Sequence, residues 1–258
     1  MFDFAHPMDR PALAANTALF LSNPFGVAQE WVGISDCLGP QASCRAYDRP
    51  GAFTHDARLA SQPVHLVAHG TGGYHALVTA IREPSRVHSV TLIDPDLICA
   101  LRELAPCHQF RGHLRMIRKA TDLVAENRPR EAAQRVTEWW MGRRAWGHTS
   151  PRLQARFTAA MPSVVAEWRA QAEAPLDLLG VVTLDCPVHI VTGRRVRSDI
   201  RALSQLLRVA FPDCALTTVS SARGASHLSD PHIVGPLIRN RIVSGHMPCQ
   251  AKTGQLAA

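Results

Sequence analysis

Short, mostly apolar runs recur along the chain and suggest buried strands. Val64–His69 (VHLVAH) is one such run. Because a parallel sheet is buried on both faces, its strands are predicted to lack a regular polar alternation. Six runs fit this description: Thr17–Ser22, Ala42–Tyr47, Val64–His69, His88–Asp94, Pro187–Gly193 and Ala215–Ser220.

Helical patterns follow several of these runs. Apolar residues recur at helical spacing over Gly72–Ile81, Ile200–Val209 and Pro231–Ile242. Asp230 is suited to the N-cap of the last of these helices, because Pro231 then occupies its first position. Strands that alternate with helices predict an α/β fold with a mostly parallel central sheet flanked by helices on both faces.

One long helical stretch interrupts the alternation, from about Leu101 to Leu179. A helical insertion between two parallel strands would lie over the carboxyl ends of the sheet, where such folds bind ligands. We therefore expect a core domain of residues 1–100 and 180–244 with a helical lid of residues 101–179. The tail, residues 245–258, has little apolar periodicity and is expected to be disordered.

Composition and charge narrow the class of protein. The chain has 258 residues, 46% of them hydrophobic, which is enough for one substantial core. It contains no apolar stretch long enough to span a membrane and does not begin like a signal peptide, so the expected compartment is the cytoplasm. Seven cysteines occur without any CxxC pair, which favours neither a disulfide framework nor a zinc site.

The formal net charge of +7 raises the question of nucleic-acid binding. The densest basic stretch, Arg111 to Arg144, is interleaved with glutamates, as on the solvated face of a helix. We therefore expect a small-molecule substrate or ligand and no nucleic-acid partner. An acidic small molecule is compatible with the charge, and the sequence leaves the oligomeric state open.

The segment from Val64 to Ile81 carries the most specific signal. A strand runs into a turn of small residues and then into a helix, and the turn reads Ala-His-Gly-Thr-Gly-Gly over residues 68–73. This segment resembles the nucleophile elbow of the α/β-hydrolase family, which reads roughly G-H-S-x-G-G. In that alignment Gly70 stands at the position of the nucleophilic serine. Glycine adopts the strained turn at little cost but offers no oxygen for attack.

Other landmarks of the same family follow in the same order, so the resemblance spans roughly residues 17 to 243. They are an oxyanion loop at Leu19–Trp31, a D-R-x-G turn at Cys44–Gly51, a strand end at Thr91–Leu97, lid-like sequence at Val136–Trp146 and a histidine loop at Ser220–Leu228. The crossover at Ala52–Ala60 is shorter than the family's usual helix. The resemblance implies an α/β-hydrolase fold with a helical lid and a rebuilt pocket.

The resemblance also implies roles for individual residues. His227 corresponds to the general base, and Asp94 to an acid that would orient it; Asp96 and Asp199 are the other carboxylates considered. The oxyanion hole would use the backbone N–H groups of Thr71 and Asn23. A register one residue later would place Pro24, which has no N–H, at the second donor position.

Three further residues are assigned to the substrate pocket: Ser22, His69 and Trp140. The lid tryptophans also suit packing of the lid against the core. No glycine-rich phosphate loop or clustered ligand set is present, so we expect no cofactor and no metal.

Three functions are compatible with these observations. The first is an enzyme that uses His227 in acid/base chemistry on a small, largely apolar molecule, such as an elimination, isomerisation or cyclisation, without a serine nucleophile. The second is an inactive homologue that binds a small ligand or a partner protein. The third is residual or water-mediated hydrolysis of esters or thioesters, with water activated by His227 or attack by Thr71 or Ser22.

Overall fold

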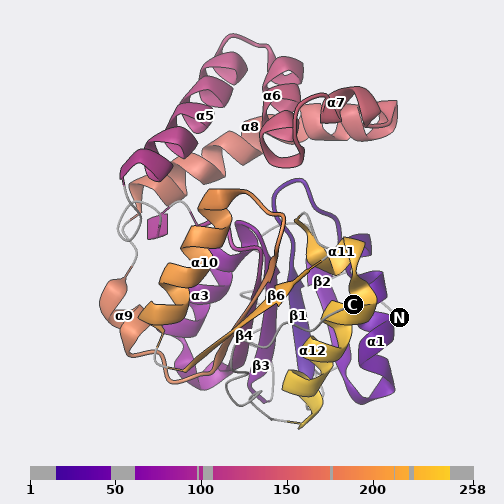
Figure 1. Cartoon of the computed structure of the whole chain (residues 1–258), viewed down its shortest axis with the longest axis vertical. Coiled ribbons are helices and arrows are strands. Elements are labelled where there is room, and N and C mark those ends of the chain that lie inside the picture. Colours follow the sequence, from indigo (N-terminus) through magenta and orange to yellow (C-terminus); the bar gives the residue numbers. More distant parts are fainter. Residues whose placement is uncertain are drawn as a thin grey trace.

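The central sheet has six parallel strands in the order β2-β1-β3-β4-β5-β6 (Figure 1). The computed structural model describes residues 16–47, 62–97, 99–100, 107–174, 177–211, 213–220 and 224–244. The strands are β1 (Thr17–Leu21), β2 (Ser43–Tyr47), β3 (Val64–His69), β4 (Val87–Ile93), β5 (Val188–Gly193) and β6 (Cys214–Val219). The six predicted strands are therefore confirmed, with ends that differ by a residue or so.

Helices cover both faces of the sheet. One face packs against α3 (Gly72–Arg82), α9 (Leu178–Val182) and α10 (Ser198–Ala210), and the other against α1 (Val32–Leu38) and α12 (Pro231–Ser244). Short helical turns complete the core domain: η1 (Ala28–Trp31), η2 (Gly39–Gln41), η3 (Pro84–Arg86) and α11 (Ser226–Ser229). The three helices predicted from periodicity are confirmed as α3, α10 and α12.

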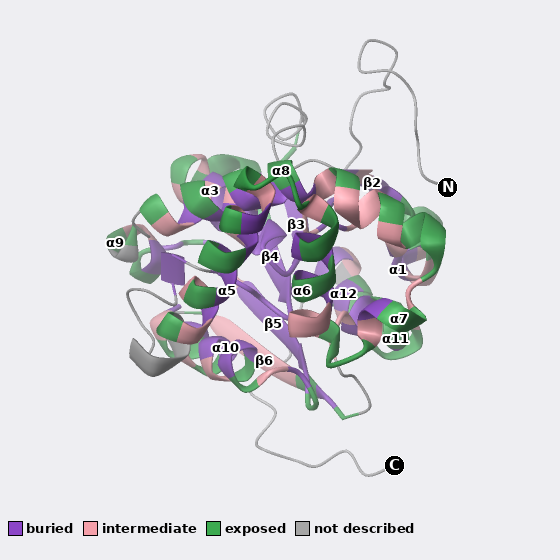
Figure 2. Cartoon of the chain, turned by 90° about the horizontal axis from the view of Figure 1, so that it is seen from above, coloured by how far each residue is buried: buried purple, intermediate pink, exposed green. Residues whose placement is uncertain are grey.

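Alternate residues of each strand enter opposite layers of the core. In β1, Leu19 and Leu21 pack toward α3 and α10, whereas Phe20 packs toward α1 and α12. Because both faces are covered, the inner strands are buried except at His88 near the start of β4, whereas the edge strand β6 is mostly half-exposed (Figure 2). This explains why the strands appeared in the sequence as nearly continuous apolar runs.

Four further helices form a separate layer above the sheet: α5 (Cys107–Ala125), α6 (Pro129–Met141), α7 (Ala145–His148) and α8 (Pro151–Glu173) (Figure 1). We call α5 to α8 the helical layer. It has its own apolar core, which also takes in Phe25 from the loop after β1. Arg156 donates a hydrogen bond to the Phe25 carbonyl at 2.7 Å, so the layer is tied to the carboxyl edge of the sheet.

The predicted helical stretch between β4 and β5 is thus present, while its role as a lid and its boundaries stay predictions. The segments 48–61 and 245–258, which include the end of the D-R-x-G turn, the short crossover and the predicted disordered tail, lie outside the described residues. Among the helices that the structure describes, none is both long and apolar enough to cross a membrane.

Candidate active site

The turn between β3 and α3 has the geometry expected of a tight strand-to-helix elbow. Gly70 has φ +58°, in the left-handed region, and its N–H donates to the Ile93 carbonyl at 3.0 Å. Two residues later, a Cβ on Gly72 would lie 2.8 Å from the Leu21 carbonyl oxygen and 2.9 Å from that of Ser22. Glycine at position 72 therefore lets the start of α3 approach the end of β1.

Asn23, in the loop after β1, lies directly beside this turn. Among the described residues, a Cβ added to Gly70 would meet only the Asn23 Cβ, at 3.4 Å, within a radius of 4 Å. The Asn23 Oδ1 accepts from the Phe25 N–H at 2.8 Å, so its Nδ2 is the atom that donates to His69 Nδ1, at 3.1 Å. The loop and the elbow therefore meet as expected, and the oxyanion-hole roles of Asn23 and the buried Thr71 stay predictions.

Trp31 packs against the predicted base, His227. The indole Nε1 donates to Ser22 Oγ at 2.9 Å, and the ring stacks on His227 with centroids 4.4 Å apart and on Phe20 at 4.9 Å. Since indole donates but does not accept, the Ser22 hydroxyl oxygen is engaged by Trp31. Ser22 therefore helps to position the Trp31 ring on which His227 stacks.

The expected hydrogen bond between Asp94 and His227 is absent, because the carboxylate of Asp94 is occupied by other donors. Its Oδ1 accepts from the Gly193 N–H at 2.8 Å and from Thr192 Oγ1 at 3.2 Å, and its Oδ2 accepts from the Ser226 N–H at 3.2 Å. Asp94 thus joins the end of β5 to the start of α11. It orients His227 through the backbone rather than by contact with the imidazole.

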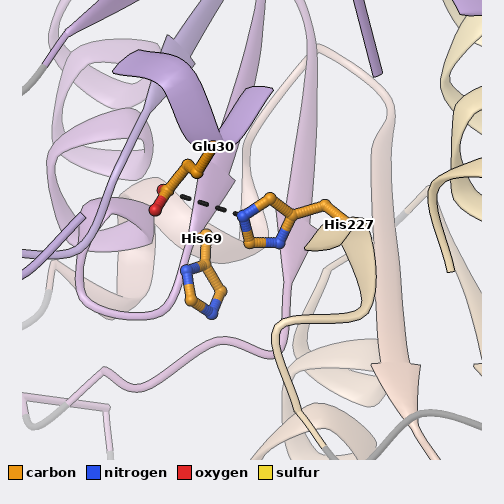
Figure 3. A group of neighbouring side chains, drawn as sticks. All are labelled: Glu30, His69 and His227. Atoms are coloured by element: carbon orange, nitrogen blue, oxygen red, sulfur yellow. Dashed lines mark ion pairs between the residues drawn. The ribbon is translucent and has the colours of Figure 1, made fainter. Parts of the chain in front are cut away.

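A different carboxylate faces His227. Glu30 Oε1, from η1, lies 3.7 Å from His227 Nε2, and the His69 ring lies 4.5 Å from the His227 ring between centroids (Figure 3). One ligand atom from each of Glu30, His69 and His227 lies within 4.8 Å of the other two. We call these three side chains the Glu–His–His cluster. Gly26 leaves room for it, because a Cβ there would lie 2.7 Å from Glu30 Oε2.

Burial favours the neutral form of all three side chains. It raises the pKa of Glu30, against the opposing effects of His69 and a hydrogen bond with Ser22. It lowers the pKa of His227 to about 3, and burial together with His227 lowers that of His69 to about 4. Within the described residues, three buried atoms of the cluster have no hydrogen-bond partner: both ring nitrogens of His227 and Oε1 of Glu30. The cluster therefore holds free lone pairs beside the elbow.

A second buried group of ionisable residues joins the helical layer to the core. His113 of α5 lies with its Nε2 3.5 Å from Asp96 Oδ1 and its Nδ1 3.6 Å from Asp199 Oδ2. Arg197 forms an ion pair with Asp199 and lies over the Trp139 ring, with Cζ 4.4 Å from the centroid. We call Asp96, His113, Arg197 and Asp199 the clamp.

The two alternative acids, Asp96 and Asp199, belong to the clamp, and Trp140 contacts it. Asp199 pairs with Arg197 and His113 of the clamp, and Asp96 Oδ2 accepts from Trp140 Nε1 at 3.2 Å. Trp140 also packs edge-on against Phe25 at 5.3 Å. It therefore lies at the contact between layer and core, and its contact with a substrate stays a prediction.

Glu30 is the site residue that sequence reasoning missed. It lies inside the Leu19–Trp31 segment that was aligned with the oxyanion loop, but it belongs to no motif there. The sequence held one indirect signal: Glu30 stands in a short segment between a glycine and a tryptophan. A carboxylate that is buried in such a segment needs a polar or charged partner. The partner, His227, comes from the opposite end of the chain.

Comparison with solved structures identifies the fold. A hydrolase from Oleispira antarctica superposes with a TM-score of 0.66 at 14% identity, covering 90% of this chain and 92% of that one. A carboxylesterase from Bacillus subtilis gives 0.65 at 15%, covering 92% and 87%. An enol-lactonase from Burkholderia xenovorans LB400 gives 0.64 at 13%, covering 87% and 90%. This chain therefore has the α/β-hydrolase fold.

Searches by sequence return nothing: no protein-family model and no curated protein matches the chain. At identities of 13–15% the structural likeness speaks for the fold alone. Function has to be argued from the site.

Proposed function

We propose that this chain is an enzyme of the α/β-hydrolase fold that moves protons on a small, largely apolar molecule without a covalent intermediate on serine. The observation that carries the proposal is the pairing of Gly70 with the Glu–His–His cluster. The elbow is kept in its strained conformation, at φ +58°, while the position that would point a nucleophile into the site is glycine. No acyl-enzyme can form at that position.

The residues around the turn support a working site rather than a decayed one. His227 is buried against Trp31 and faces Glu30, and the loop that carries it is fixed by Asp94. Buried polar atoms without partners destabilise a fold, so a protein with no use for them is expected to lose them. The retained atoms favour proton transfer to and from a bound molecule, in which His227 is required.

The solved structures of the same fold include esterases and an enol-lactonase, which act on carbonyl compounds by name. A carbonyl compound with an acidic C–H is therefore a suitable probe. An oxyanion formed by loss of that proton would meet the N–H groups at Thr71 and Asn23, the predicted oxyanion hole.

The proposal is tested by proton exchange, which needs no knowledge of the natural substrate. Small ketones and lactones are incubated with the protein in D2O, and loss of the C–H signal is followed by ¹H NMR. We expect catalysed exchange that falls about 100-fold or more in His227→Gln, the scale of general acid–base catalysis. Exchange no faster than in buffer across the panel, or exchange unaffected by His227→Gln, would overturn the proposal.

A second candidate function is binding of a small molecule without turnover. The burial of the cluster favours it, since His227 is 1% and His69 9% exposed. This candidate predicts a ligand that raises the melting temperature and emerges unchanged.

A further inference from the structure

The Glu–His–His cluster has the composition and spacing of a metal site. Its members come from η1, the end of β3 and α11, and Figure 3 shows Glu30 and His227 facing one another with His69 beside them. Their ligand atoms lie within 4.8 Å of one another, and Glu30 Oε1 and His227 Nε2 are 3.7 Å apart. Ligands about 2.0–2.1 Å from a tetrahedral Zn²⁺ lie about 3.4 Å apart. Small side-chain rotations would therefore complete the geometry.

The free lone pairs point independently to a ligand. Within the described residues, Glu30 Oε1 and both ring nitrogens of His227 are buried and lack hydrogen-bond partners. Within that same part of the chain, Glu30 forms no ion pair with an arginine or a lysine. A cation held between Glu30 Oε1 and His227 Nε2 would give each of these two atoms a partner.

The third ligand is already in a suitable tautomer. Because Asn23 Nδ2 donates to His69 Nδ1, that nitrogen carries a lone pair and the ring proton resides on Nε2. A metal bound at Nδ1 would displace only one neutral hydrogen bond. Asn23 Oδ1 would keep its bond to the Phe25 N–H, so the loop would hold its shape.

We propose that Glu30, His69 and His227 bind a divalent transition-metal ion, Zn²⁺ in the first instance, and that this ion carries the hydroxide that accepts the substrate proton. Two imidazoles and one carboxylate suit Zn²⁺ and are a poor set for Mg²⁺ or Ca²⁺, which take oxygen ligands. Three protein ligands leave one position open for water, as in catalytic zinc sites.

The inference rests on the proposed function in placing the reaction at this cluster, and it names the proton acceptor. A zinc-bound water has a pKa of about 7, so hydroxide is available at neutral pH. The hydroxide would take a proton from the substrate C–H and become water; the electron pair of that bond would form a C=C bond, and the π pair of the carbonyl would move to its oxygen. In the part of the chain that the structure describes, only Asn23 Cβ lies within 4 Å of the Cβ position of Gly70, so the glycine leaves space next to the cluster.

Metal binding is measured on the full chain after dialysis against a chelator. We expect added Zn²⁺ to raise the melting temperature, with Mg²⁺ having no effect, and Co²⁺ to give the visible absorption of a tetrahedral site with nitrogen and oxygen ligands. Glu30→Gln and His227→Gln should each weaken binding about tenfold or more. His148→Gln, at an exposed histidine of α7, is the matched control and should bind as the unsubstituted protein does.

Two results would overturn the metal site: no Zn²⁺ binding by the folded protein, or binding and Co²⁺ absorption that persist unchanged in both Glu30→Gln and His227→Gln. Circular dichroism of the metal-free variants tests whether they are folded. If one of them is unfolded, Asn23→Ala serves as a second variant: it removes no ligand and must retain Zn²⁺ binding. The two proposals can fail separately. Proton exchange that continues in chelator but is lost in His227→Gln rejects the metal and keeps the proposed function, whereas Zn²⁺ binding without exchange activity does the reverse.

Discussion

Two groups of buried ionisable side chains lie at the carboxyl edge of the sheet, and they are built in opposite ways. The clamp contains a permanent positive charge, Arg197, paired with Asp199, and His113 between Asp199 and Asp96 joins the helical layer to the core. The Glu–His–His cluster has no arginine or lysine in ion-pair contact within the described residues, and it lies inside the core domain beside Gly70.

The difference separates a structural role from a functional one. Charges that pair with one another hold two layers of a protein together, and removal of one partner leaves the other buried and uncompensated. Side chains that burial keeps neutral, and that have buried polar atoms without hydrogen-bond partners, contribute little to stability but can bind a proton or a ligand. Substitutions in the clamp should therefore change stability, and those in the cluster should change activity.

The largest effect is expected for Arg197→Met. Without the guanidinium, the carboxylate of Asp199, 8% exposed, keeps His113 and the Ile200 N–H as partners but loses its permanent counter-charge. We expect the free energy of unfolding to fall by about 3–5 kcal/mol, measured by urea titration. Arg195→Met, at an exposed neighbour, should stay within about 0.5 kcal/mol of the unsubstituted protein. Equal stability of the two variants would show that the clamp does not stabilise the fold.

Acid pH should weaken the clamp as well. Burial alone would raise the pKa of Asp199, but the hydrogen bond from His113 and the charge of Arg197 outweigh it and lower the pKa to about 2, from an ordinary value of 3.8. A carboxyl whose folded pKa is depressed stabilises the fold above its unfolded pKa and loses that contribution as the pH falls toward 2. On the order of 2 kcal/mol should disappear in this range.

Denaturant titration at several pH values from about 4 down to about 2 measures this loss, because the unfolded and folded pKa values of Asp199 lie near these limits. In Asp199→Asn the acid-dependent part should be missing and the stability at neutral pH lower. If Asp199→Asn showed the same pH dependence as the unsubstituted protein, the loss would have to come from other carboxyl groups.

A smaller effect is expected at the elbow. Gly70 has φ +58°, so Gly70→Ala places a Cβ in the left-handed region and should cost about 1–2 kcal/mol. Gly147→Ala is the matched control, because Gly147 lies in α7 with no described residue within 4 Å of a new Cβ, and there alanine should be neutral or stabilising. Thermal unfolding of the two variants measures the contrast. A neutral Gly70→Ala would mean that the turn is not strained.

The smallest effect on stability is expected inside the cluster. Glu30→Gln and His227→Gln replace ionisable side chains with neutral ones of similar size, so the free energy of unfolding should change by less than about 1 kcal/mol. Catalysed proton exchange should nevertheless be lost in His227→Gln. A variant of the cluster that unfolds at the same denaturant concentration as Arg197→Met would erase the distinction between the two groups.

The fold could be predicted because its signals are local. Each strand is a short apolar run, and the strained turn at Gly70 is encoded in six consecutive residues. The same holds for His227, which was found through the pattern around it. The structure places it at the elbow, stacked on Trp31.

The partners of His227 could not be predicted, because they depend on contacts between distant segments. Asp94 was expected to bind the imidazole, but backbone N–H groups of Gly193 and Ser226 take its carboxylate, and backbone donors leave no trace in a sequence. Glu30 and His69 complete the cluster from two other segments. Rules of ligand spacing detect only ligands that are close in sequence, so they could not indicate a cluster drawn from three segments, and the expectation of no metal stays a prediction.

The most direct test of the central claim, that the site lacks a covalent nucleophile but keeps its reaction centre, is the intact mass of the protein after reaction with an activated aryl ester. The account predicts no acyl adduct on the unsubstituted chain, an adduct on Gly70→Ser, and slower acylation when His227→Gln is added to Gly70→Ser. An adduct on the unsubstituted chain, at Ser22, Thr71 or any other hydroxyl, would contradict it, and so would a Gly70→Ser variant that stays unmodified.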